Sequence, residues 1–197
     1  MDSVEIKSEL LMSYQELVDY LLKKYGPAKY DYFRTESCRS KNKNISRSSE
    51  GLICHHIDED KAIMLSNPRW AINNPFEYQK ANRLVYCNIL EHLILHIKIA
   101  EEPKPEGANL LEDQGIGGAV NFICRELNDY YDGYNYKKES DKKKFSLVAN
   151  NFEDYIKVLH ELWRVVKGND KYSFFVTKEI IASGWDGHIV DKVYTEL

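Results

Sequence analysis

Long apolar runs, an export signal and paired cysteines are all lacking in this 197-residue chain. No run approaches the roughly 20 consecutive apolar residues of a membrane span, so no membrane partner is expected. The first residues lack a basic segment followed by an apolar core, so no signal peptide is expected. The four cysteines (Cys38, Cys54, Cys87 and Cys124) form no C-x2-C pair, which argues against a zinc ribbon and, without an export signal, against a disulfide framework. We therefore predict a cytoplasmic protein with reduced thiols, in which Cys54 and Cys87 act as small buried hydrophobic side chains.

The chain also lacks an excess of positive charge. Its formal net charge is −4, and an acidic chain does not attract phosphate through its overall field. Any nucleic-acid partner must therefore be recognised by local basic patches. A phosphate-binding loop is not expected, because the only glycine-rich stretch, 115–118, has no Lys-Ser/Thr after it and no strand before it.

Hydrophobic patterning predicts two short strands and a helix in the middle of the chain. Residues 51–57 and 83–87 have the composition of short buried strands, and turn residues fill the segment between them. The pattern then changes to helical spacing over 88–99. This order predicts a small unit of two strands followed by a helix.

The rest of the chain is predicted to be mainly helical. Ser13 and Glu16 fit a capping box at the start of an amphipathic segment. The predicted elements are helices at 13–25, 121–131 and 152–166, an exposed basic arm at 30–49, a proline-containing linker at 101–106, a charged connector at 137–144 and a mixed tail at 172–197. We expect three regions: an N-terminal helix and arm in 1–50, a core in 51–100, and a helical region in 101–197 that packs on the core.

Four of the six histidines fall in two short motifs, His55-His56 on the first strand and His92-x3-His96 on the helix. His92 and His96 lie one helical turn apart, so both project from the same face. Successive strand residues point to opposite faces, so one of the tandem pair can face the helix as a third ligand while its neighbour points away. Three protein ligands leave a metal position open, as catalytic sites require. We predict one divalent ion, and Mg²⁺, Mn²⁺, Ni²⁺ and Zn²⁺ all stay open, because histidine ligands accept several metals.

These motifs, with Asn82 before the apolar run 84–87, resemble the HNH endonucleases of the ββα-metal (His-Me finger) superfamily. The resemblance implies an α+β fold with a small ββα-metal core embedded in a mostly helical chain. It also implies that His55, His92 and His96 bind the metal ion. His56 would then be the general base.

In the same resemblance, Asn82 is the residue that pins the loop between the two strands. Asn82 lies about one residue further from the first helical histidine than the family pattern places it, and the segment after the tandem histidines is longer. Arg83 or Asn88 could therefore take part of that role.

The resemblance implies metal-dependent hydrolysis of phosphodiester bonds in DNA, with RNA as an alternative substrate. A histidine general base would take a proton from the attacking water. The basic arm precedes the first strand and supplies candidate phosphate contacts, while a charged arm that only aids solubility is the alternative. The candidate nucleic-acid-binding residues are Arg34, Arg39, Lys41, Lys43 and Arg47.

Three other functions fit the same residues. A catalytically inactive ββα unit stapled by zinc could bind nucleic acid or protein without cutting. A metal-dependent hydrolase of another ester would use the same ligands but would have no affinity for polyanions. In an all-helical interaction protein, the histidines would be incidental and no metal would bind stoichiometrically.

A few further residues have weaker signals. Glu91 could orient an imidazole or could be a solvated helix residue. The acidic run 58–60 could crowd the site or form a solvated turn. His160, in an apolar helix, is predicted to be structural, His188 is predicted to be an ordinary loop residue, and the lysines of 137–144 are predicted to be solvated.

Overall fold

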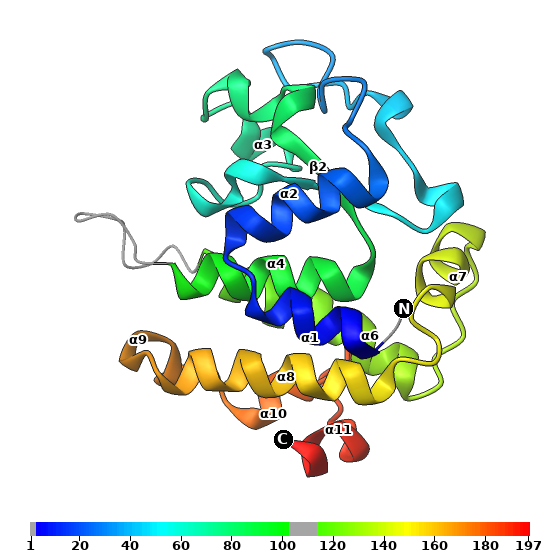
Figure 1. Cartoon of the computed structure of the whole chain (residues 1–197), viewed down its shortest axis with the longest axis vertical. Helices are drawn as coiled ribbons and strands as arrows, with labels where there is room; N and C mark the ends of the chain where they lie inside the picture. Colours follow the sequence, from blue (N-terminus) through cyan, green and yellow to red (C-terminus); the bar gives the residue numbers. More distant parts are fainter. Residues whose placement is uncertain (1–2, 103–113) are drawn as a thin grey trace.

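Two antiparallel strands, β1 (Ile53–His56) and β2 (Leu84–Cys87), form a small sheet next to the central helix of the molecule (Figure 1). The computed structural model describes residues 3–102 and 114–197. In the register of the sheet, His55 pairs with Val85 and His56 pairs with Leu84. The helix-rich α+β class is confirmed for the described residues.

Helix α4 (Ile89–Glu101) follows β2 after a single residue, Asn88. The side chain of Asn88 accepts hydrogen bonds from the backbone N–H groups of Leu90 and Glu91, and Glu91 bonds back to the Asn88 backbone N–H. This capping box sets where the helix begins and therefore the direction in which its histidines project. Helix α4 extends two residues beyond the predicted end, and the predicted linker falls mostly outside the described residues.

Helix α4 is buried along nearly all of its length, because other helices cover it on several sides (Figure 1). Its partners include α1 (Ser3–Leu11), α2 (Tyr14–Tyr25) and α8 (Phe152–Lys167). One hydrophobic cluster contains residues from α1, α2, α4 and the C-terminal helices. The sheet lies on one side of α4 and α8 lies on the opposite side.

The basic arm is irregular, as predicted, but it is not simply exposed. It contains only the one-turn helices η1 (Lys43–Ile45) and η2 (Ser48–Glu50). Its apolar side chains nevertheless form a second small core against the outer face of the sheet. The members from the arm are Tyr32, Phe33, Cys38 and Ile45, and Ala28 and Leu52 join them from either side of the arm. This burial anchors the arm beside β1.

The segment between the strands contains four short helical turns rather than a tight hairpin. They are η3 (Ile57–Asp60), α3 (Pro68–Ala71), η4 (Phe76–Gln79) and η5 (Ala81–Arg83). Arg83 forms a bidentate ion pair with Asp58, at 2.7 and 2.5 Å, and so joins the end of this segment to its beginning. The long insertion is therefore closed by a partly buried charged pair next to the sheet.

The C-terminal half is largely helical, and it includes helices in two segments where none is predicted, 137–144 and 172–197. The predicted connector at 137–144 is largely helix α7, because acidic residues in its first turn and lysines in its last turn suit the helix dipole and Phe145 is buried. The remaining helices are α5 (Ile116–Gly118), the π-helical turn η6 (Ala119–Ile123), α6 (Cys124–Tyr131), α7 (Glu139–Ser146), α9 (Asp170–Ser173), α10 (Lys178–Ile181) and α11 (Asp191–Glu196).

Among residues 3–102 and 114–197, no helix is both long enough and apolar enough to cross a bilayer. All four cysteines are free. Cys87 is fully buried as predicted, whereas Cys54 is only partly buried. Burial raises the pKa of the Cys54 thiol to about 12, so this thiol stays protonated at neutral pH.

Candidate metal centre

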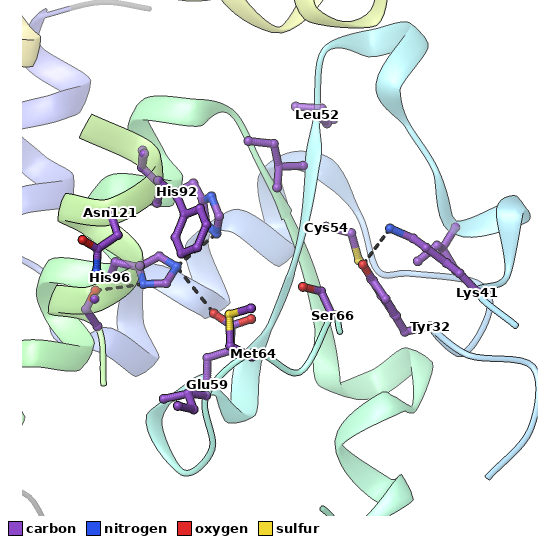
Figure 2. Close-up of a pocket in the computed structure, with 18 of the residues that line it drawn as sticks. Tyr32, Lys41, Leu52, Cys54, Glu59, Met64, Ser66, His92, His96 and Asn121 are labelled. Atoms are coloured by element: carbon purple, nitrogen blue, oxygen red, sulfur yellow. Dashed lines mark hydrogen bonds and ion pairs between the residues drawn. The ribbon is translucent and has the colours of Figure 1, made fainter. Parts of the chain in front are cut away.

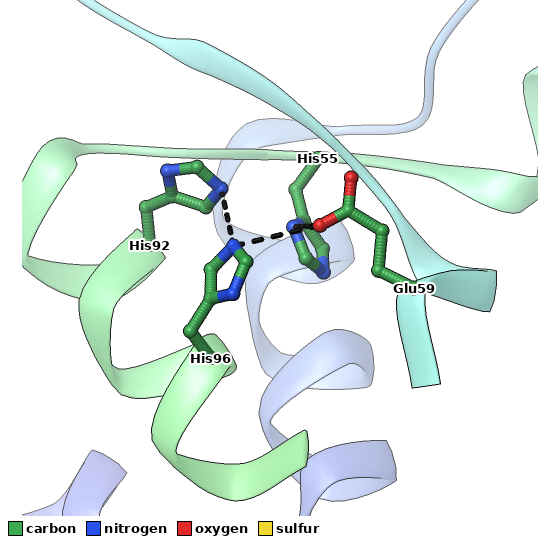
Figure 3. A group of neighbouring side chains, drawn as sticks. All are labelled: His55, Glu59, His92 and His96. Atoms are coloured by element: carbon green, nitrogen blue, oxygen red, sulfur yellow. Dashed lines mark hydrogen bonds and ion pairs between the residues drawn. The ribbon is translucent and has the colours of Figure 1, made fainter. Parts of the chain in front are cut away.

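Three of the four motif histidines, His55, His92 and His96, converge with Glu59 between β1 and α4 (Figure 3). One nitrogen of each imidazole and one carboxylate oxygen lie within 4.8 Å of one another. His55 comes from β1, His92 and His96 come from α4, and Glu59 comes from η3. The group matches the three ligands predicted from the sequence and adds a carboxylate.

The alternation of β1 separates the two tandem histidines, as predicted. His55 faces α4, and its ring centroid lies 5.2 Å from that of His92 and 5.5 Å from that of His96. His56 faces the other side, where its ring packs against Tyr32 with a centroid distance of 4.3 Å. Only one of the pair can therefore join the ligand group through its ring.

Two hydrogen bonds fix which nitrogen each of two histidines presents. The Tyr14 hydroxyl donates to the Ile57 carbonyl at 2.7 Å, so it accepts the Nε2–H of His55 at 3.0 Å, and Nδ1 of His55 is left unprotonated. Nδ1 of His96 donates to the Gly115 carbonyl at 3.1 Å, which leaves Nε2 of His96 unprotonated. Both lone pairs point into the group, an arrangement typical of metal-binding histidines.

The spacing of the donor atoms fits a single ion. Nε2 of His92 and Nε2 of His96 are 3.2 Å apart. Glu59 Oε2 lies 3.5 Å from both His55 Nδ1 and His96 Nε2. Ligands at metal bonds of about 2.0–2.1 Å in a tetrahedral site are separated by about 3.3 Å. The four groups therefore need only small movements to bind one ion.

Burial keeps these imidazoles neutral and available as ligands. The pKa of His55 and that of His92 are held well below the usual value by burial and by neighbouring histidines. The pKa of His96 is also lowered by burial, although Glu59 and the Gly115 carbonyl oppose the shift. Nδ1 of His55 is buried and has no hydrogen-bond partner within the described part of the chain. A divalent cation would satisfy this atom, whereas leaving it unpaired is costly.

The predicted general base, His56, is fully buried. Its Nε2 lies 3.0 Å from the Gln79 side-chain oxygen, and the Gln79 amide nitrogen donates to the Leu65 carbonyl at 3.3 Å. These contacts place the proton on Nε2 and the lone pair on Nδ1. Nδ1 of His56 lies 3.7 Å from Glu59 Oε1 and has no hydrogen-bond partner among the described residues. The tautomer suits a base, but Glu59 lies in front of the lone pair.

Asn82, predicted to pin the loop, is exposed on η5, and its side chain has no hydrogen-bond partner in residues 3–102 and 114–197. Two neighbours make the contacts that hold this region. Arg83 binds Asp58, and Asn88 caps α4. Of the two alternatives, Arg83 makes a contact that closes the segment between the strands, whereas Asn88 caps the helix that follows.

A cleft of about 640 Å³ opens beside the histidines (Figure 2). His92, His96 and Glu59 line it, whereas His55 and His56 do not. In Figure 2, His92, His96 and Asn121 lie on one side, and Tyr32 and Lys41 lie on the other. Other lining residues are Ile45, Arg47, Cys54, Met64, Gly117, Gly118 and Phe122. The site can thus be reached by a ligand from the side of His92, His96 and Glu59.

Two of the five predicted arm contacts, Lys41 and Arg47, line this cleft. Lys41 Nζ donates to the Tyr32 hydroxyl at 2.6 Å, and Arg47 pairs with Glu50 while its guanidinium lies over the Tyr86 ring. Both cations are therefore held in place beside the cleft. The remaining three, Arg34, Arg39 and Lys43, are exposed on the arm and do not line the cleft.

The sequence analysis missed several residues of the site. Tyr14 has only a helical signal in the sequence, and Glu59 belongs to an acidic run for which a solvated turn is the alternative to a place at the site. The glycine stretch 115–118, for which no phosphate-binding loop is expected, contributes Gly115, Gly117 and Gly118 to the wall of the cleft. A Cβ atom on Gly118 would overlap the His96 ring, so only glycine leaves room for this imidazole.

Of three weaker predictions, two are corrected by the surroundings of the residue. Glu91 is neither solvated nor bonded to a histidine. It is fully buried and accepts hydrogen bonds from Lys24 and Tyr25. His160 is exposed on the outer face of α8 rather than packed in the core, because the apolar positions of that helix lie on its other face. His188 is a loop residue, as predicted, with Asp186 and Asp132 beside it.

Comparison with known proteins does not place the chain in a family. No protein family, curated protein or solved structure matches it. The functional argument therefore depends on the geometry and chemistry of the site.

Proposed function

We propose that this protein is a metal-dependent endonuclease of the HNH (ββα-metal) type that hydrolyses phosphodiester bonds in DNA. The observation that carries the proposal is the convergence of three neutral imidazoles, from a strand and from the following helix, at a cleft. The order β1, β2, α4 is the order that the HNH resemblance implies. His55, His92 and His96 are the proposed ligands.

The donor set suits one divalent ion, and when bound the ion would polarise a phosphodiester oxygen. The chain supplies the other functions. Tyr14 and Gly115 hold two imidazoles in their ligating tautomers. Lys41 and Arg47 place positive charge at the cleft, where a polyanion would pass. His56, with its lone pair on Nδ1, is the proposed base for the attacking water.

A second function has one specific observation in its favour. Glu59 completes a group of four possible ligands, and a metal site closed by four protein ligands is typically structural. His56 is also fully buried. A zinc-stapled module that binds nucleic acid or protein without cutting is therefore the competing proposal.

Cleavage of supercoiled plasmid by the metal-stripped full chain, with Mg²⁺, Mn²⁺, Ni²⁺ or Zn²⁺ added back, separates the two functions. We expect nicking with at least one ion, and a loss of about 10²–10⁴-fold in His56→Ala because general-base catalysis contributes on this scale. His160→Ala is the matched control, since this histidine is exposed on α8 and outside the metal group. It should cut as the wild type does.

One result would count against the nuclease, and another would count against the assignment of its base. If no ion supports cutting while one ion binds tightly per chain, the binding module is the better assignment. If His56→Ala cuts at the wild-type rate, the assignment of His56 as the base is wrong.

A further inference from the structure

The Glu59 carboxylate lies close to both residues of the tandem histidine motif, His55 and His56. One carboxylate oxygen, Oε2, lies 3.5 Å from His55 Nδ1, and the other, Oε1, lies 3.7 Å from His56 Nδ1. Both nitrogens are buried and lack hydrogen-bond partners in the part of the chain that the structure describes. The carboxylate thus separates the proposed ligand group from the proposed base.

We propose that Glu59 is a fourth, displaceable metal ligand, and that its carboxylate marks the position taken by the phosphate of the substrate. This inference rests on the metal site of the proposed function. It adds Glu59 as a ligand that the HNH resemblance did not imply. In this inference the Glu59 carboxylate competes with the substrate phosphate for one position on the metal. The site then takes a monoanionic oxygen ligand, either its own carboxylate or a phosphodiester.

The ligand assignment follows from the lone pairs. The hydrogen bonds to Tyr14 and Gly115 leave an unprotonated nitrogen on His55 and on His96, and both nitrogens face Glu59 Oε2. A carboxylate oxygen brings a further lone pair into the same small space, and lone pairs do not attract one another. A cation at the centre of the group turns these contacts into favourable ones.

Glu59 is also the least firmly held member of the group. It comes from η3, where the preceding residue Asp58 has a non-helical backbone conformation, and no described residue donates a hydrogen bond to its carboxylate. Its side chain is 16% exposed and lines the cleft. By contrast, neighbouring Asp58 is held by Arg83 and Lys61. A ligand entering through the cleft therefore meets Glu59 at the accessible edge of the group.

Displacement would cost little electrostatically, because one monoanion replaces another at the metal. It would also uncover Nδ1 of His56, which Glu59 covers in this structure. Binding of the phosphate and exposure of the base are then coupled. A phosphodiester would open the site for its own hydrolysis, and the free protein would keep it closed.

The test uses the full chain loaded with Co²⁺, whose visible absorption depends on the number and type of its ligands, and inorganic phosphate as the probe. We expect Glu59→Ala to change the absorption bands and to weaken Co²⁺ binding by about tenfold. We expect the same variant to bind phosphate about tenfold more tightly than the wild type, because the competing carboxylate is gone. In wild type, saturating phosphate should move the bands towards those of the variant.

Asp60→Asn is the matched control, because it removes the same charge one residue away from a carboxylate outside the cleft and the ligand group. It should leave the Co²⁺ bands and the phosphate affinity unchanged. Glu59→Gln keeps the shape of the side chain and serves if the alanine variant fails to fold. It should give an intermediate phosphate affinity.

Identical bands in wild type and both Glu59 variants would show that Glu59 is not a ligand. A band change on mutation without any response of the wild type to saturating phosphate would show a permanent ligand and refute displacement. Neither readout involves cleavage. If the plasmid assay shows no cutting, the proposed nuclease function is refuted. The assignment of Glu59 as a metal ligand is not affected by that result.

Discussion

The nitrogen that His55 can present to a metal depends on one hydroxyl group. Tyr14 is buried in α2, and its hydroxyl bridges His55 Nε2 and the Ile57 carbonyl. Without this acceptor, the proton of the imidazole can move to Nδ1 and block the proposed ligand atom. The role of Tyr14 is therefore to position a ligand rather than to contact the ion.

Tyr14→Phe should weaken metal binding by about 10–100-fold with little change of fold, because partners that orient a ligating histidine contribute on this scale. Metal titration of the purified variant measures the effect. Tyr86→Phe is the control, since its buried hydroxyl also donates to a backbone carbonyl, that of Ile45 at 2.7 Å, but away from the histidines. Equal metal affinity in the two variants would contradict the assigned role.

At the scale of elements, the packing of α1, α2 and α4 encloses an unusual group of charges. Lys24 of α2 forms ion pairs with Glu5 of α1 and with Glu91 of α4. Glu9 of α1 is fully buried beside them, 3.7 Å from the Lys24 ammonium, and both of its oxygens lack a hydrogen-bond partner among the described residues. Burial, followed by the charge of Glu91, raises the pKa of Glu9 to about 8.

A raised pKa means that folding favours the protonated carboxyl of Glu9. The contribution of this protonated carboxyl to the free energy of unfolding is fully present below about pH 4.5 and is lost as the pH rises through about 8. We expect Glu9→Gln to reduce this loss, so that the variant gains about 1–3 kcal/mol over the wild type between pH 5 and pH 9. Urea unfolding of both proteins at pH 5 and pH 9 measures this difference in the free energy of unfolding. Glu77→Gln, at an exposed position on η4, should show no such gain, and a parallel response of the Glu9 variant would refute the prediction.

At the scale of the whole molecule, a net charge of −4 works against binding a polyanion. The arm that carries Lys41 and Arg47 to the cleft also exposes Arg34, Arg39 and Lys43. A DNA chain leaving the cleft along the arm would meet these three cations. The local positive charge of the arm would then offset the negative net charge of the chain.

Replacing Arg34, Arg39 and Lys43 together by alanine should weaken DNA binding and lower the slope of log affinity against log salt by about 2–3, because each lost phosphate contact contributes about 0.9. Fluorescence anisotropy of a labelled duplex over a salt series measures the slope. Alanine at Lys137, Lys138 and Lys143, which are exposed around and on α7, is the control. A slope that falls equally in both triple variants would argue against a specific path along the arm.

Some of this architecture follows from the sequence by itself. The spacing of His92 and His96 on a capped helix requires both imidazoles to share a face, and the alternation of β1 requires His55 and His56 to point apart. The order of two strands and a helix and the capping boxes at Ser13 and Asn88 are likewise local properties. Each depends on residues only a few positions apart, so periodicity and side-chain chemistry determine them.

Only the tertiary structure decided which tandem histidine joins the group and what surrounds it. Tyr14 meets His55 across 41 positions, and Gly115 meets His96 across 19, and no local pattern encodes such contacts. Glu59 lies between Asp58 and Asp60 in one acidic run, and which of the three carboxylates reaches the histidines depends on the path of η3 and on how the long insertion closes through Arg83. Long-range packing sets these positions, because burial and hydrogen bonding are satisfied across the whole chain rather than within one segment.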